Sequence, residues 1–93
     1  MFKMQIVLDE QKMTENGYSS PDIYNRLDRI FESLNINKTS KGVFEGKGTP
    51  HDFGNFGGAI IILKRQNWFM PLVNTWLWHT DTGIEDVASH LRK

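Results

Sequence analysis

The stretch "KMQIVLDE" at residues 3–10 is an apolar run that stops on two neighbouring carboxylates, Asp9 and Glu10. A carboxylate held at the end of a strand could bind a cation or move a proton. Strands also commonly end on an acidic residue that only contacts water. On these residues alone, both interpretations of Asp9 stay open.

Two histidines stand close to acidic residues: His51 precedes Asp52, and His79 lies two positions before Asp81. Each pair could supply metal ligands or an acid and a base. Nothing in the sequence links the two pairs, so polar loop residues are the simpler interpretation. The nearby "GKGTPHDFGNFGG" is rich in glycine, but no Lys-Ser or Lys-Thr follows at the spacing of a phosphate-binding loop, which excludes that motif.

Basic residues gather in the middle of the chain, at Lys38, Lys41 and Lys47. They could form a local track for an RNA backbone, and Tyr24 or Phe44 could stack on a base. The alternative is a hairpin whose lysines only contact water. We predict Lys38, Lys41 and Lys47 as the RNA-binding residues.

The chain has 93 residues, enough for one small domain, which we expect to span residues 1–93. Basic and acidic residues balance at 11 each, so no overall field attracts nucleic acid or a membrane, and any such contact must be local. The absence of cysteine excludes disulfides, thiolate zinc sites and thiol nucleophiles. No segment has the length of a membrane span or the pattern of a secretory signal, so we expect a cytoplasmic protein without membrane contact.

The first half of the chain predicts a strand, a helix and a hairpin. Residues 2–8 alternate with the period of a half-buried strand. A helix is expected to begin with Ser20 as N-cap and Pro21 at its first position. Its apolar stripe consists of Ile23, Leu27, Ile30, Phe31 and Leu34. "INKTS" and "GVFEG" then form a tight β-hairpin around Lys41 and Gly42.

The segment "GNFGGAIIILKRQNWF" is ambiguous. Three consecutive isoleucines and a glycine pair favour a strand, whereas Phe53, Phe56, Ile60 and Leu63 keep helical spacing. Local patterns leave the choice open. If the segment is helical, the order becomes βαββαβ, the ferredoxin-like plan of an α+β protein.

After Pro71, "VNTWLWH" predicts a buried strand with Trp76 and Trp78 on one face. We expect the tryptophans to lie in the core or at a dimer interface. Thr82 and Glu85 have the spacing of a capping box, which predicts a short C-terminal helix.

Three stretches resemble the virulence-associated protein D (VapD) family, small ferredoxin-like proteins related in fold to the small CRISPR-associated nuclease-like subunit. "QIVLDE" is similar to an apolar strand that ends in Asp, and "YNRLDRIFESLNINKTSKGVF" to a Tyr-bearing helix followed by a strand. "NWFMPLVNTWLWHTDTGIEDVASHLRK" is similar to the end of the second helix, the last strand and an amphipathic end. The resemblance covers nearly the whole chain. It implies a second helix from about Asp52 to Trp68, where Gly57 and Gly58 would permit close packing.

The resemblance also implies an endoribonuclease, often the toxin of a toxin and antitoxin pair, acting as a homodimer with its first-strand Asp near the dimer seam. That residue is Asp9 here. Successive side chains of a strand point to opposite faces of the sheet. If Met4, Ile6 and Leu8 face the helices, Asp9 is therefore expected on the open face, where a second copy would cover it. Two Asp9 carboxylates could then share a divalent cation such as Mg²⁺, which would polarise a phosphodiester and activate a bound water.

The chain departs from the family in its last strand. Where the family has an Arg-Asp pair and a further Arg, this sequence has Asn74, Thr75 and Leu77. Neutral side chains cannot replace a guanidinium that clamps phosphate. Two hypotheses follow: a dimeric, metal-dependent ribonuclease with Asp9 as catalytic residue and metal ligand, and a catalytically inactive dimeric binding or regulatory module of the same fold.

Overall fold

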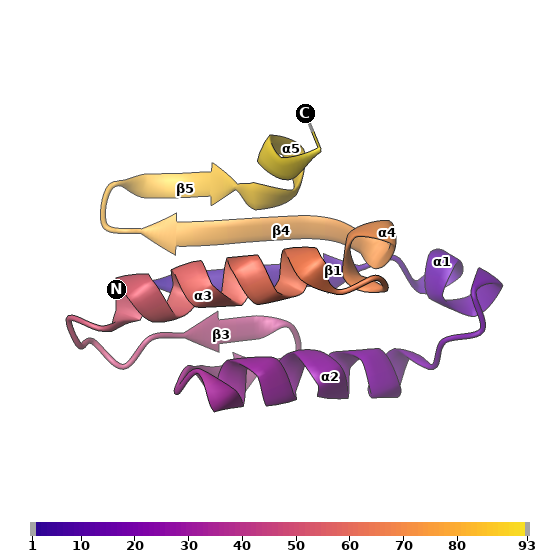
Figure 1. Ribbon diagram of the computed structural model, residues 1–93, viewed down its shortest axis with the longest axis horizontal. Coiled ribbons are helices and arrows are strands. Elements are labelled where there is room, and N and C mark those ends of the chain that lie inside the picture. The colour runs from indigo at the N-terminus through magenta and orange to yellow at the C-terminus, as the bar shows by residue number, and fades with distance from the viewer. Residues whose placement is uncertain (1, 93) are drawn as a thin grey trace.

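A single antiparallel sheet forms the centre of residues 2–92, which are the residues that this computed structural model describes. Its strands stand in the order β2-β3-β1-β4-β5. Helices α2 and α3 lie side by side over one face of the sheet (Figure 1). In chain order the elements are β1 (Lys3–Leu8), α1 (Glu10–Glu15), α2 (Ser20–Ser33), β2 (Asn37–Ser40), β3 (Val43–Glu45), α3 (Asp52–Arg65), α4 (Phe69–Leu72), β4 (Val73–Thr80), β5 (Gly83–Asp86) and α5 (Val87–Leu91). The predicted α+β class is confirmed.

Strand β1 is central because it pairs antiparallel with β3 on one side and with β4 on the other. Its side chains alternate as predicted: Met4, Ile6 and Leu8 are buried beneath the helices, whereas Val7 is 40% exposed on the opposite face. A strand has a side-chain period of two, so this alternation fixes which face of the sheet each residue occupies.

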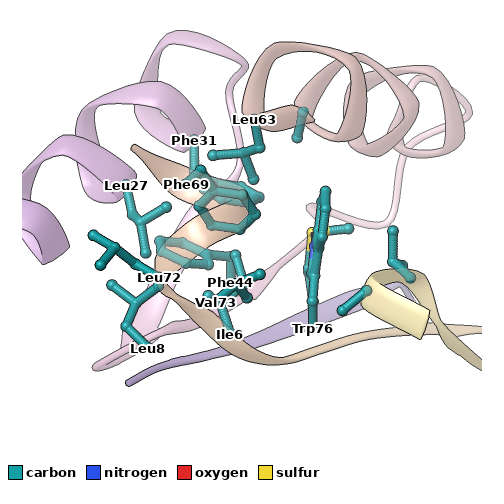
Figure 2. Close-up of a cluster of buried hydrophobic side chains, with 14 of the residues drawn as sticks. Ile6, Leu8, Leu27, Phe31, Phe44, Leu63, Phe69, Leu72, Val73 and Trp76 are labelled. Carbon is teal, nitrogen blue, oxygen red and sulfur yellow. Dashed lines mark hydrogen bonds between the residues drawn. The ribbon is translucent and has the colours of Figure 1, made fainter. Parts of the chain in front are cut away.

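The core fills the space between the sheet and the helices (Figure 2). The predicted stripe of α2 supplies Ile23, Leu27 and Phe31, all fully buried. Burial of a large apolar side chain contributes about 1.5–3 kcal/mol, so this stripe accounts for much of the packing of α2.

Aromatic rings form much of this core. Phe31 of α2 stacks on Phe44 of β3, with ring centres 3.9 Å apart and planes tilted by only 6°. Trp76 packs edge-on against Phe69 at 4.9 Å, and its indole Nε1 donates to the sulfur of Met4 at 3.0 Å. Trp68, Trp76 and Trp78 are all buried, which confirms the core interpretation of the tryptophans.

The ambiguous segment is helical, as α3 and the separate short helix α4. The expected start at Asp52 is confirmed, but α3 ends at Arg65, before Trp68. Phe56, Ala59 and Leu63 face the sheet and are fully buried, so tertiary packing overrides the strand preference of the three isoleucines. The expected role of the glycines is wrong for Gly57, which has open space around it, and Gly58 makes only an ordinary contact with Leu34.

The N-terminal connection differs from the prediction. Helix α1 was not expected, since it is six residues long and buries only Met13. The N-cap of α2 is Ser19 rather than Ser20. Ser20 is instead the first helical residue, and its hydroxyl donates to Glu10 at 3.1 Å. The hydroxyl therefore ties α2 to α1.

The C-terminal prediction is partly wrong. Thr82 and Glu85 do not form a capping box, because residues 83–86 pair with β4 as strand β5. The short helix does follow, but its N-cap is Asp86, which accepts from the backbone N–H of Ser89 at 3.1 Å. The β-hairpin of β2 and β3 is confirmed, with Gly42 in the left-handed conformation at φ 73°.

The face of the sheet opposite the helices carries few buried side chains. Val7 and Ile84 are 40% and 64% exposed there, and Leu77 beside them is half-buried. Figure 2 looks along the sheet and shows the helices packed on one side only. Within residues 2–92, none of the helices has the length and hydrophobicity needed to cross a membrane.

Candidate functional site

Asp9 lies immediately after β1 and serves as the N-cap of α1. Its Oδ1 accepts a hydrogen bond from the backbone N–H of Lys12 at 3.1 Å, and its own N–H donates to the carbonyl of Leu72 at 2.8 Å. A carboxylate at this position satisfies an otherwise unpaired helix N–H and is favoured by the helix dipole. Asp9 thus has a local structural role, and its side chain is only partly buried.

A hollow of about 310 Å³ lies close to Asp9, between the N-terminal half of α2 and the β2–β3 hairpin. We call it the basic hollow, after two of the predicted RNA-binding lysines, Lys38 and Lys41, which line it. Its other lining residues are Ser20, Pro21, Tyr24, Asn25 and Asp28. Helix α2 and the hairpin therefore bring an aromatic ring, an amide and two ammonium groups together.

Both lysines of the basic hollow have acidic neighbours. Lys38 Nζ lies 3.0 Å from Oδ2 of Asp28, and Lys41 Nζ lies 3.7 Å from Oε1 of Glu10. The lysine side chains are 47% and 65% exposed, so water screens these pairs and each contributes little to stability. An incoming phosphate could therefore replace a carboxylate at small cost.

Tyr24 connects the basic hollow to the end of β1. Its hydroxyl accepts a hydrogen bond from the backbone N–H of Leu8 at 3.2 Å, one residue before Asp9. The ammonium of Lys41 lies 4.6 Å from the centre of its ring. Glu10, adjacent to Asp9, contacts both Ser20 and Lys41. These contacts place the predicted acid and two of the predicted lysines in one neighbourhood.

The other predicted RNA contacts lie elsewhere. Lys47 is beyond the far end of β3, where its Nζ donates to Oδ1 of Asn35 at 2.6 Å. Phe44 cannot stack on a base, because it is fully buried against Phe31. This correction follows from its place on the helix-facing side of β3, where the ring completes the core.

The histidine pairs do not form a site. His51 is exposed at the start of α3, and its neighbour Asp52 accepts hydrogen bonds from other groups. His79 lies on β4, with its Nε2 buried and without a hydrogen-bond partner among the residues described. Within residues 2–92, no group of three His, Cys, Asp or Glu side chains is arranged to hold a metal ion.

Asp52 is the residue whose structural importance the sequence did not reveal. It is only 3% exposed, and its carboxylate accepts from the backbone N–H groups of Lys47 and Gly48, at 3.2 and 2.8 Å. The hydroxyl of Thr49 lies 3.4 Å away. A glycine-rich loop that leads to an Asp at a helix start is the only signal that could have indicated it. Its role is to order the loop before α3.

Comparison of the chain with models of known protein families and with curated protein sequences gave no match. The resemblance to VapD therefore rests on the order and spacing of the motifs and remains a prediction.

Proposed function

We propose that this chain is a VapD-like endoribonuclease that acts as a homodimer and binds RNA in the basic hollow beside Asp9. The observation that carries the proposal is that Lys41 contacts both Glu10 and Tyr24, and Tyr24 bonds to Leu8, so these groups gather at the end of β1 where Asp9 follows. An acid, a cation and an aromatic ring together are suited to a nucleotide, which offers an anionic phosphate and a flat base.

Each group has a distinct part in the proposed cleavage. The ammonium groups of Lys38 and Lys41 offset the phosphate charge, and the ring of Tyr24 stacks on a base once Lys41 moves away. The Asp9 carboxylate accepts the proton of an attacking water. The water oxygen bonds to phosphorus, the bond to the leaving ribose oxygen breaks, and that oxygen takes up a proton.

A divalent cation such as Mg²⁺ belongs to the same proposal, but it requires more than one chain. In the part of the chain that the structure describes, Asp9 is not one of three clustered metal-binding side chains. Further ligands would have to come from the second Asp9, the RNA and water. The chemistry of such an ion is charge stabilisation at the phosphate.

The homodimer is proposed to form through the open face of the sheet. Val7, Leu77 and Ile84 are exposed or half-buried there, and apolar side chains on one sheet face favour burial by a second copy. The open face adjoins the end of β1, where Asp9 follows. A cytoplasmic location and an antitoxin protein as partner complete the proposal.

A ferredoxin-like fold is part of the proposed relationship. Four strands in the order β2-β3-β1-β4, all antiparallel, with α2 and α3 as crossovers on one face, support this plan. Strand β5 would then be an addition at one edge.

A cleavage assay on structured and unstructured RNA, with Mg²⁺, Mn²⁺ or a chelator, tests the proposal. Asp9→Asn removes the charge but retains a good N-cap, so a loss of at least a hundredfold in rate with unchanged stability would support a chemical role. Lys41→Gln is expected to weaken RNA binding severalfold. Lys64→Gln, at the exposed end of α3, is the control for general loss of charge. Equal cleavage by the parent chain and Asp9→Asn would refute the assignment.

The alternative function is a dimeric binding or regulatory module without catalysis. The capping bond from Lys12 to Asp9 favours it, because that bond gives Asp9 a purely structural purpose. The neutral Asn74, Thr75 and Leu77 of β4 favour it too, as no guanidinium is available at these positions. RNA binding that depends on Lys41, without cleavage under any metal condition, would support this alternative.

A further inference from the structure

Helix α3 differs from α2 in the residues that face away from the sheet. The exposed residues in the body of α2 are all polar: Asp22, Asn25, Arg26, Arg29, Glu32 and Ser33. Helix α3, in contrast, has no charged residue between Asp52 and Lys64. A surface helix normally carries a polar face opposite its buried one, and a helix that is apolar all round is normally covered on all sides. Helix α3 therefore lacks the polar face that contact with water favours.

The outer face of α3 consists of Gly54, Gly57, Gly58 and Ile61. These residues lie opposite the side that faces the sheet, because an α-helix has 3.6 residues per turn. Ile61 is 50% exposed, and a Cβ at Gly54 or Gly57 would meet nothing within 4 Å. In Figure 1, α3 lies in front of the sheet, and no other element of residues 2–92 passes in front of it. The outer face is thus uncovered in the single chain.

The single chain gives no reason for glycine at these positions. Glycine weakens a helix relative to alanine, and none of the three glycines has the positive φ that would require it. Gly58 makes one ordinary contact, with Leu34 at 3.8 Å, and Gly57 makes none. Glycines do provide a flat surface that a second backbone can approach closely. The outer face is therefore suited to the packing of another helix.

The spacing on the outer face is symmetric about its centre. Gly54 lies three residues before Gly57, and Ile61 lies three residues after Gly58. Two copies of α3 can pair antiparallel about a two-fold axis between Gly57 and Gly58. Each Ile61 then lies over Gly54 of the second copy and fills the space that the glycine leaves. A two-fold interface requires a self-complementary surface of this kind.

The charges at the two ends of α3 also favour the antiparallel arrangement. Lys64 and Arg65 are exposed at its C-terminal end, and neither makes an ion pair within residues 2–92. The same holds for the exposed Glu85, which lines a surface hollow together with Phe53 near the N-terminal end. A parallel pair would bring the basic ends together, whereas an antiparallel pair places each basic end beside an acidic one. The charges thus complement those of a second copy.

We propose that α3 pairs antiparallel with α3 of a second copy of this chain. Its 14 residues span about 21 Å at a rise of 1.5 Å each, so the contact is smaller than a standard interface. We therefore expect a dissociation constant of roughly 10–100 µM. The outer face and the open face of the sheet lie on opposite sides of the molecule. The proposal consequently does not depend on the dimer proposed above, and the two contacts together would build a larger assembly.

Sedimentation equilibrium of the full chain, from about 5 to about 500 µM, measures the association. Gly57→Glu and Gly57→Lys are the test variants, because the open space at Gly57 accommodates either side chain. Each variant places two like charges beside the two-fold axis, so each alone should associate at least about tenfold more weakly. An equimolar mixture of the two should recover the association, because opposite charges then meet at the axis. Failure of the mixture to recover it would overturn the proposal.

Folding of the variants is checked by thermal unfolding. Glutamate and lysine are better helix formers than glycine, so neither Gly57 variant should melt below the parent. Glu32→Lys, on the exposed side of α2, is the matched control for an added positive charge and should associate as the parent does. Association of both Gly57 variants as strong as that of the parent would refute the α3 contact.

Ile84→Lys, on the open face of the sheet, separates the two contacts, and Ile84 is exposed enough for this variant to fold. We expect this variant to retain the α3 contact, and Gly57→Glu added to it to remove that contact. If Ile84→Lys alone abolishes all association and Gly57→Glu has no effect, the α3 proposal fails while the dimer of the proposed function stands. The reverse pattern supports the α3 contact and removes the open-face dimer.

A lipid surface is the other occupant that an apolar helix face could have. Co-sedimentation with vesicles of phosphatidylcholine and phosphatidylglycerol tests it. We expect no vesicle binding. A parent chain that stays monomeric up to about 500 µM would overturn the second copy as occupant. Vesicle binding by that monomer, if Gly57→Glu abolished it, would assign the outer face to a membrane instead.

Discussion

The basic hollow and a second hollow, lined by the rings of Phe2, Phe53 and Trp78 and called the aromatic hollow, lie at opposite ends of the sheet and differ in the side chains that line them. In the basic hollow, Lys38 and Lys41 are each close to a carboxylate. In the aromatic hollow, three rings in mutual contact form most of the lining, with centres 5.5 Å apart for Phe53 and Trp78 and 6.0 and 6.1 Å from Phe2 to these two. A charged ligand of the basic hollow therefore competes with existing ion pairs, whereas the aromatic hollow offers mainly ring surface.

The comparison shows why the number of charged residues is a poor guide to binding. A phosphate at Lys41 must displace Glu10, although a surface ion pair is worth only about 0–1 kcal/mol. Selectivity thus depends on the local pairing of charges, in a chain whose 11 basic and 11 acidic residues cancel.

The largest expected difference in stability is between a ring in the core and an exposed ring of the aromatic hollow. Phe44, opposite Met4 in the sheet, is fully buried and stacked on Phe31, whereas Phe53 is 62% exposed. Phe44→Ala should lower the free energy of unfolding by about 4 kcal/mol, since it removes the ring and leaves a cavity. Phe53→Ala should lower it by less than about 1 kcal/mol. Urea unfolding curves measure both; similar losses would contradict this division between core and surface.

Two glycines with positive φ, Gly42 and Gly48, differ in the space around them. Gly42, at the basic end, and Gly48, in the loop before α3, have φ values of 73° and 80°. A Cβ at Gly42 would collide with the carbonyl of Ile6, but at Gly48 it would meet nothing. Gly42→Ala should therefore cost about 3 kcal/mol, and Gly48→Ala only about 1 kcal/mol from backbone strain. Thermal denaturation of the two variants checks the order, which would be wrong if Gly48→Ala were the less stable.

Asp52 holds together the loop before α3, close to the aromatic hollow. Asp52→Ala would leave the N–H groups of Lys47 and Gly48 without their acceptor, at a cost of about 2 kcal/mol. Asp52→Asn keeps one acceptor oxygen and should lose about half as much. Hydrogen exchange of these two N–H groups reports the same loss locally. Unchanged protection in Asp52→Ala would exclude the proposed role of the carboxylate.

Asp9 gives the smallest expected change in stability. Asp9→Ala should cost about 1 kcal/mol because the N–H of Lys12 loses its cap, whereas Asp9→Asn should be nearly neutral. Circular dichroism during heating measures the difference. A large loss of stability in Asp9→Asn would show that the negative charge is structural, and would make that variant unsuitable as a test of catalysis.

Those parts of the fold whose pattern is long and regular could be predicted from the sequence. The alternation in β1, the stripe of α2 and the turn at Gly42 each depend on local spacing, and all are observed. Strand β5 was missed because its four residues are exposed and show no alternation of burial. Helix α1 is too short to show a period.

The candidate site could be predicted only in part, since sequence spacing does not give side-chain partners. Lys38 and Lys41 lie together because they flank the tight turn of a hairpin. Lys47 belongs to the next loop, and its distance from them depends on where β3 ends. The aromatic hollow joins Phe2, Phe53 and Trp78, which only the folded chain brings together.

The central place of β1 has a consequence for the order of folding. Its partner β3 follows about 40 residues later in the chain, whereas β4 pairs with it from residues 73–80. During synthesis, one edge of β1 therefore stays unpaired until residues 73–80 have emerged. An unpaired edge can associate with other chains, and contacts between distant residues slow folding. A chain cut before β4 would thus have a partly formed sheet that is prone to aggregate.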